Sequence, residues 1–110
     1  MGIIKSYPVT KIVNGLTVNT SDSIICKSIS YTTKGESAIV VRGVSECVIT
    51  LDEKTTDHIT IKSMTNVTIK SDKLIDDEYN EIETERGASV ELRYIVDGWY
   101  IMSSDGLKNT

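Results

Sequence analysis

Apolar and polar residues alternate along most of the chain, which is the pattern of β-strands. The alternation is clearest in residues 47–51, 58–62, 66–70 and 90–96. A period of two places every second side chain on the same face of a strand. Each segment can therefore bury one face and present the other to solvent or to a partner. The pattern predicts an all-β protein.

Turn signals separate these segments. Asn14-Gly15 lies between two short apolar runs, and Asp97-Gly98 lies between residues 94–96 and 99–101. Both dipeptides tolerate the positive φ of a two-residue hairpin turn, so each predicts a hairpin. Further breaks fall at Lys34-Gly35 and Arg86-Gly87. We expect about eight to ten short strands, arranged as a compact antiparallel sandwich, a jelly-roll-like fold or a small barrel.

Two segments bear on how the strands are connected. Residues 76–81, Asp-Asp-Glu-Tyr-Asn-Glu, have too few apolar positions for an amphipathic helix, and we expect a long loop there. The sequence of residues 58–63, HITIKS, is echoed by NVTIKS in residues 66–71. Two copies are fewer than a solenoid generally needs, and a meander of similar strands explains the echo as well.

Length and composition indicate one small domain over residues 1–110. The chain has 39% apolar residues and no Phe, so Ile, Val and Leu must fill its core. Its net charge is −4, with acids and bases interleaved, which disfavours nucleic acid as a partner. Residues 1–8 do not read as a secretory signal, and no apolar run is long enough to span a membrane. In a chain made in the cytosol, Cys26 and Cys47 are expected to be small, buried, reduced residues.

Motifs for catalysis or metal binding are sparse. His58 is the single histidine, and no recognisable nucleophile motif accompanies it, so a surface or interface role is favoured over general-base chemistry. The two cysteines and this histidine lack zinc-ligand spacing, and the acidic residues 72–78 lack the pattern of a calcium loop. We therefore expect a binding or architectural protein, not an enzyme, with no cofactor and no metal.

The second half of the chain carries four motifs in a distinctive order. They are ITIK at residues 59–62, NVTI at 66–69, GxSVxLxY at 87–94 and GWYI at 98–101. From Cys47 onward this order resembles a β module that recurs in structural proteins of tailed bacteriophages, and residues 46–104 span it. Tail fibres, tailspikes and capsid decoration proteins carry such modules. One departure is Ile75-Asp76-Asp77, where members of the group often carry glycine after Ile-Asp, so the loop is expected to differ.

The resemblance implies a virion structural protein. If these 110 residues are the complete chain, they leave little room for a separate anchor and receptor-reading tip, and the chain then looks similar to the small cement or staple proteins of short-tailed phages. Such a protein is made in the host cytoplasm, sits on the capsid surface, binds the assembled major capsid protein and stabilises the head. Self-association as a dimer or trimer is expected. The alternative is a tail fibre or tailspike module that binds a host-surface receptor or carbohydrate.

Candidate contact residues lie near the two ends of the chain. Residues 1–7 and 103–110 mix polar and apolar side chains that can reach a neighbour, although frayed termini explain them equally well. Trp99 and Tyr100 follow a predicted turn and can anchor an interface, although a core position is the more common role for such residues. The candidate interface residues are Ile3, Ile4, Tyr7, Trp99, Tyr100 and Leu107.

Overall fold

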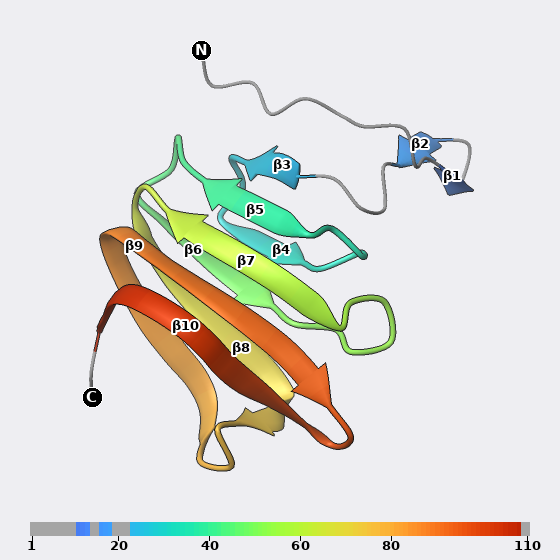
Figure 1. Cartoon of the computed structure of the whole chain (residues 1–110). Coiled ribbons are helices and arrows are strands. Elements are labelled where there is room, and N and C mark those ends of the chain that lie inside the picture. Colours follow the sequence, from blue (N-terminus) through green and yellow to red (C-terminus); the bar gives the residue numbers. More distant parts are fainter. Residues whose placement is uncertain (1–10, 14–15, 19–22, 109–110) are drawn as a thin grey trace.

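A computed structural model describes residues 11–13, 16–18 and 23–108. The first two strands, β1 (Lys11–Val13) and β2 (Leu16–Val18), pair with each other in antiparallel fashion (Figure 1). Val13 is the register partner of Leu16, which confirms the predicted hairpin pairing. The turn residues Asn14 and Gly15 lie outside the described residues.

The remaining described strands form a single sheet that folds back on itself as two facing layers (Figure 1). They are β3 (Ser23–Cys26), β4 (Ser30–Thr32), β5 (Ala38–Val41), β6 (Glu46–Thr50), β7 (His58–Ser63), β8 (Asn66–Ile75), β9 (Tyr79–Ile95) and β10 (Gly98–Lys108). The described residues contain no helix. The all-β prediction is confirmed, and the number of described strands falls within the expected range.

The arrangement of the strands differs from the expected antiparallel sandwich, jelly roll or barrel. Strands β3, β5 and β7 pair in parallel within one layer, and β4, β6 and β8 pair in parallel within the other. Consecutive strands thus alternate between the layers, and each pair completes one coil of a stacked-coil solenoid. Each crossing from layer to layer takes only a short loop, so the parallel pairing needs no helical crossover.

The echo between residues 58–63 and 66–71 follows from this arrangement. The two segments are β7 and the first part of β8, which lie in opposite layers of the same coil and do not pair with each other. The meander interpretation was therefore wrong. Both segments place β-branched residues toward the same core, since Ile59, Ile61, Val67 and Ile69 are all buried. Similar burial requirements account for the similar sequences.

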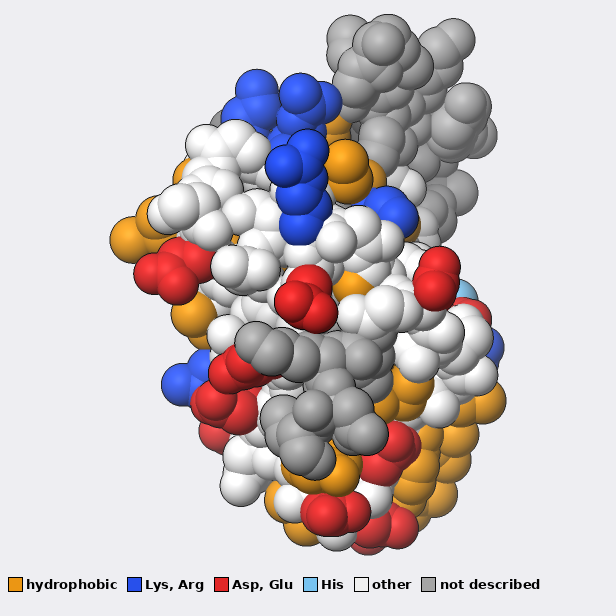
Figure 2. All heavy atoms as spheres, turned by 90° about the vertical axis from the view of Figure 1, so that its left-hand side faces the viewer, with side chains coloured by type: hydrophobic (Ala, Val, Ile, Leu, Met, Phe, Trp, Pro, Cys, Tyr) orange, Lys and Arg blue, Asp and Glu red, His pale blue; other side chains and the backbone are white. Residues whose placement is uncertain are grey.

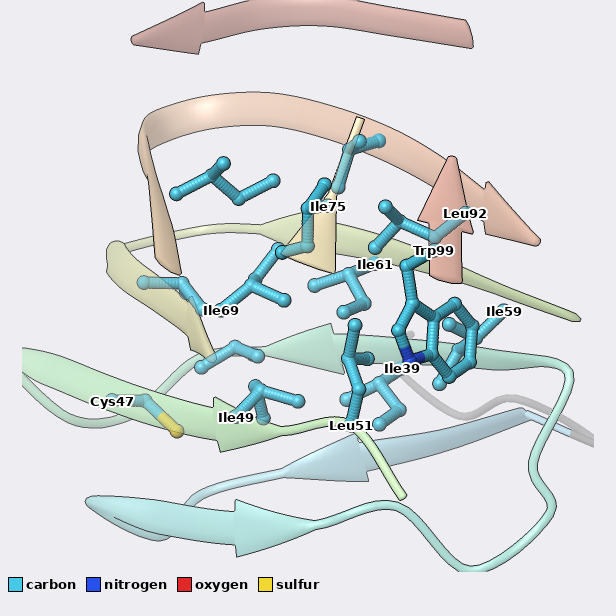
Figure 3. Packing of buried hydrophobic residues seen from close by; sticks show 14 of the residues in the cluster. Ile39, Cys47, Ile49, Leu51, Ile59, Ile61, Ile69, Ile75, Leu92 and Trp99 are labelled. Carbon is cyan, nitrogen blue, oxygen red and sulfur yellow. The ribbon is translucent and has the colours of Figure 1, made fainter. Parts of the chain in front are cut away.

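The core consists of isoleucine-rich rows that run from coil to coil between the layers (Figure 3). In one layer Ile39 pairs with Ile61, and in the other Ile49 pairs with Ile69. All four side chains have 0% exposure. Burying one such side chain contributes about 1.5–3 kcal/mol. Stacking the coils therefore supplies the hydrophobic stabilisation that one isolated coil lacks.

Strands β9 and β10 close one end of the coil stack. Strand β9 pairs antiparallel with β8 through residues 79–84 and with β7 through residues 89–93, so it crosses from one layer to the other. Gly87, with a φ of 94°, lies at this crossing. Strand β10 follows β9 around the bend, and Gly106 has a φ of 77°; a Cβ at this position would lie 3.2 Å from the Ala88 Cα. Glycine meets both requirements because it has no Cβ.

The acidic segment forms a tight turn instead of the predicted long loop. Asp76 and Asp77 have φ values of 53° and 61°, and the Glu78 N–H donates to the Ile75 carbonyl at 3.1 Å. Positive φ at both central residues is the pattern of a type I′ turn, and aspartate tolerates it better than most residues. Residues 79–81 already belong to β9. Aspartate thus occupies both positive-φ positions of this turn.

The last hairpin turn is shifted by one residue from the predicted Asp97-Gly98. Gly98 already pairs with Ile95, so the turn residues are Val96 and Asp97. The Asp97 N–H donates to the Ile95 carbonyl at 2.7 Å, and Val96 between them has a φ of 60°. This is a γ-turn with a positive central φ, a rare and strained form. Val96 is also 89% exposed, so its side chain gains little from packing.

We expect Val96→Gly to stabilise the protein. A left-handed conformation costs a non-glycine residue roughly 1–2 kcal/mol, and glycine removes that cost at a smaller loss of chain entropy. The expected gain is about 1 kcal/mol, seen as a higher melting temperature by circular dichroism. Val96→Ala keeps the Cβ and should gain much less. Equal melting temperatures for Val96→Gly and the unchanged protein would show that the turn is not strained.

Candidate docking edge

The end of the coil stack opposite the β9–β10 cap presents two edge strands, β3 and β4 (Figure 1). The Cys26 carbonyl accepts from the Arg42 N–H at 3.0 Å, which directs Cys26 toward β5. Successive residues of a parallel strand bond alternately to its two sides, so the Ile25 N–H and carbonyl point away from β5. Within the described residues no strand pairs with β3 on that side.

Strand β4 presents its outer edge in the same way. The Thr33 N–H donates to the Thr50 carbonyl at 3.0 Å, and the Ile29 carbonyl accepts from the Val48 N–H at 2.9 Å. Tyr31 lies between them and pairs with Ile49 of β6. By the same alternation, Thr32 directs its backbone groups outward. The two layers therefore end in parallel rows of backbone donors and acceptors that another chain can extend.

The two ends of the coil stack are protected to different degrees within the described residues. Strand β10 has register shifts between Ile101 and Ser103 and between Asp105 and Leu107. Bulges of this kind discourage pairing with another chain. Strand β3 pairs residue by residue with β5 and contains the uncharged sequence Ser-Ile-Ile-Cys. Nearby Ile29 is 72% exposed. The edge at β3 and β4 thus has the features of a pairing surface, and we call it the docking edge.

Basic side chains lie beside the docking edge. Lys27 follows β3 directly, and its side chain lies against Gly43, next to Arg42. Figure 2 shows Lys and Arg side chains gathered toward this end of the molecule, while Asp and Glu side chains are more frequent toward the β9–β10 cap. A partner strand that carries acidic residues would complement this charge.

A polar network fixes the loops that flank the docking edge. Glu36 is buried, and it accepts hydrogen bonds from the Tyr31 hydroxyl and the Lys34 N–H. Burial and this carboxylate raise the pKa of Tyr31 above its ordinary value of 10. Buried Thr33 joins this coil to the next, since its hydroxyl accepts from the Asp52 N–H at 2.9 Å. These contacts hold β4 in place without a further strand.

The structure places the predicted interface residues in different environments. Trp99 is fully buried and therefore occupies a core position, which is the more common role for such a residue. Tyr100 is half-buried, and its hydroxyl donates to Asp77 at 3.2 Å. This hydrogen bond raises the pKa of Tyr100. Leu107 lies in β10. Ile3, Ile4 and Tyr7 lie outside the described residues. The described residues of this set do not gather into one surface.

His58 lies on the outer surface of the β7 layer, beside Glu91 of β9. The His58 Nε2 is 2.7 Å from one Glu91 oxygen, and the Ser103 hydroxyl donates to the other at 3.1 Å. The carboxylate therefore stands between the imidazole and the hydroxyl. A serine nucleophile activated by histidine needs the imidazole in the middle. The arrangement is a hydrogen-bonded link that joins β7, β9 and β10.

The pKa of Glu91 is lowered from its ordinary value of 4.5, first by the His58 hydrogen bond and then by the one from Ser103. A lowered carboxyl pKa stabilises the folded state above the unfolded pKa, and this stabilisation is lost as the pH falls through the folded pKa. We therefore expect Glu91→Gln to lower the melting temperature at pH 7, and this effect should shrink as the pH falls through the folded pKa. Carbon-detected NMR titration should show that His58→Gln raises the Glu91 pKa more than Ser103→Ala does. The reverse order would contradict this assignment.

Cys26 and Cys47 are both free and buried, as predicted. Burial raises the pKa of the Cys47 thiol to about 12, with Cys26 contributing as a neighbour. The thiol is the unreactive form of cysteine, so Cys47 behaves as an apolar core residue at neutral pH.

In the described part of the chain, the His, Cys, Asp and Glu side chains form no group of three or more that could hold a metal ion. No helix in the described residues is long and apolar enough to cross a membrane. In comparisons with known proteins, no family model matches the chain, and no curated protein matches it either.

Proposed function

We propose that this chain is a bacteriophage virion structural protein that decorates the capsid and stabilises the head. The observation that carries the proposal is the docking edge, where β3 and β4 have no strand partner on their outer sides among the described residues, at one end of a capped coil stack. The resemblance of residues 46–104 to phage virion modules supplies the biological setting. The proposal assigns no catalytic step to the chain.

Docking of this kind works by strand addition. A segment of the major capsid protein pairs with β3 or β4, main-chain hydrogen bonds supply affinity, and side chains beside the edge select the partner. Lys27 and Arg42 favour a segment that carries Asp or Glu. A ligand that binds only the assembled lattice stabilises that state by mass action. Many copies of a modest interface therefore strengthen the whole head.

The proposal is tested by immunogold labelling of the parent particle in the electron microscope. Label spread over the head is expected, and heads stripped of the protein should then lose their infectivity or their DNA at a lower temperature. Label confined to the tail would overturn capsid decoration. It would favour the alternative that the same resemblance implies, a tail fibre or tailspike module.

A further inference from the structure

Exposed apolar side chains gather at the turn between β9 and β10, away from the docking edge. Leu74 of β8, Ile95 at the end of β9 and Val96 in the turn are all exposed. Gly98 lies between them, because it pairs with Ile95 and a Cβ added to it would lie 3.2 Å from the Leu74 carbonyl oxygen. Figure 2 shows hydrophobic side chains toward this lower end of the molecule, with Asp and Glu side chains beside them. We call Leu74, Ile95 and Val96 the apolar patch.

The strand register places the apolar patch on the outer face of the β9–β10 cap. Trp99 pairs with Ile75 of β8, and both side chains are buried in the core. Side chains alternate between the two faces of a strand, so the preceding residues Gly98 and Leu74 face outward. Ile95 is the register partner of Gly98 and shares its face. Gly98 adds no side chain between Leu74 and Ile95, so a partner can contact both.

The turn holds the Val96 side chain outward at an energetic cost. Val96 has a φ of 60° in the rare form of γ-turn, a conformation that glycine adopts without strain. Its side chain is exposed, so packing within the described residues does not offset the strain. Strained backbone is concentrated at functional sites, where it presents a group in a required position. A partner that buries the Val96 side chain therefore accounts for a strained valine in this turn.

Carboxylates lie beside the apolar patch. Asp97 follows Val96 directly, and Asp76 and Asp77 form the exposed turn that follows β8. The Tyr100 hydroxyl donates to Asp77 at 3.2 Å. This hydrogen bond raises the pKa of Tyr100, and the charges of Asp77, Asp97 and Asp76 raise it further, so the carboxylates of both turns lie near one tyrosine.

The charge around the apolar patch is negative. Residues 76–78 and Asp97 supply four carboxylates at the two turns, and the neighbouring basic residues along the strands are Lys73 and Arg93. Arg93 also has Glu91 two residues away on the same face of β9. Exposed apolar groups bordered by polar ones are typical of protein interaction surfaces. The negative border selects a partner with positive charge.

We infer that the apolar patch binds a segment of another protein in which an apolar residue is flanked by lysine or arginine. The apolar residue of the segment covers Val96 between Leu74 and Ile95, and the basic residue pairs with Asp97 or with the carboxylates of residues 76–77. A second copy placed patch to patch would bring like charges together, which disfavours self-association through this surface. The inference does not depend on capsid decoration.

The test is binding of the fluorescently labelled chain to an array of short synthetic peptides. Isoleucine or leucine, lysine or arginine, glutamate and serine are varied independently along these peptides. We expect retention only on peptides that combine apolar and basic residues. In titrations with the peptide retained best, Val96→Gly should weaken binding about tenfold. Asp97→Asn should weaken it less, and the difference from the unchanged protein should shrink at high salt, because salt screens exposed charges.

Two controls separate this surface from a folding defect and from the docking edge. Val96→Gly is expected to melt at a higher temperature than the unchanged protein, so its loss of binding does not arise from unfolding. Asp105→Asn makes the same change as Asp97→Asn on the exposed β10 strand, and it should bind the peptide normally. Ile29→Ser removes the exposed apolar side chain near the docking edge and should also bind normally.

Several outcomes would overturn the inference. They are retention of no peptide, retention on basic peptides that lack apolar residues, and unchanged binding by Val96→Gly. Self-association in analytical ultracentrifugation that Val96→Gly abolishes would assign the patch to a second copy and would also overturn it. Peptide binding is measured without phage particles, so its failure leaves capsid decoration standing. Label confined to the phage tail would likewise leave the peptide result unaffected.

Discussion

Trp99→Ala is expected to lower the free energy of unfolding by about 3–5 kcal/mol, which is the usual cost of truncating a buried tryptophan. Trp99 has 0% exposure and lies at the start of β10, in the core between the layers (Figure 3). Its ring packs against Tyr94 with a centroid separation of 5.4 Å. The truncation leaves a cavity beside Ile39 and Leu51. Urea unfolding followed by circular dichroism measures the loss.

Trp99→Phe is the matched control for this prediction. The Trp99 Nε1 is buried and has no hydrogen-bond partner within the described structure. Phenylalanine keeps an aromatic ring and removes this unsatisfied donor, so part of the lost packing is offset. We expect Trp99→Phe to be clearly more stable than Trp99→Ala. If Trp99→Ala were as stable as the unchanged protein but failed to bind phage heads, Trp99 would be an interface anchor.

Features that depend on near neighbours in the sequence could be predicted. The alternation of residues 58–62 follows directly from burial of one strand face, and the pairing of Val13 with Leu16 follows from the Asn-Gly turn signal. The shifted turn at Val96 is an instructive exception. Asp97-Gly98 is the favoured dipeptide, but Gly98 pairs with Ile95 and Val96 takes the strained φ. Pairing of the long strands β9 and β10 outweighs the local preference of the turn.

The solenoid could not be predicted, because a period of two does not reveal which strands are neighbours. The coils also differ in length. Ser23 pairs with Ala38, 15 residues later, while Ala38 pairs with Thr60, 22 residues later. Without a constant period the repeat is hidden in the sequence, and the parallel register depends on contacts distant along the chain. The docking edge was missed for the same reason, since an edge is defined only once strand order is known.

Ile25→Pro is expected to weaken binding to assembled heads by about 100-fold. The Ile25 N–H points outward from β3, so proline removes a donor that a partner strand needs and leaves a partner carbonyl unsatisfied. The lost bond and the unsatisfied acceptor together account for about 2–3 kcal/mol. Proline is tolerated on an edge strand where its missing N–H faces outward, so the fold should survive. Cosedimentation with stripped heads measures the affinity.

Ile25→Thr is the matched control, because it changes the same side chain but keeps the backbone N–H. Threonine also suits a strand, so this variant should fold and bind nearly as well as the unchanged protein. If both variants lose binding equally, the Ile25 side chain makes the contact and strand addition is excluded. If neither loses binding while both remain folded, β3 is not the docking strand. Thr32→Pro then tests β4, because the Thr32 N–H points outward from the other layer of the same edge. If this variant also keeps its binding, strand addition at the docking edge is overturned.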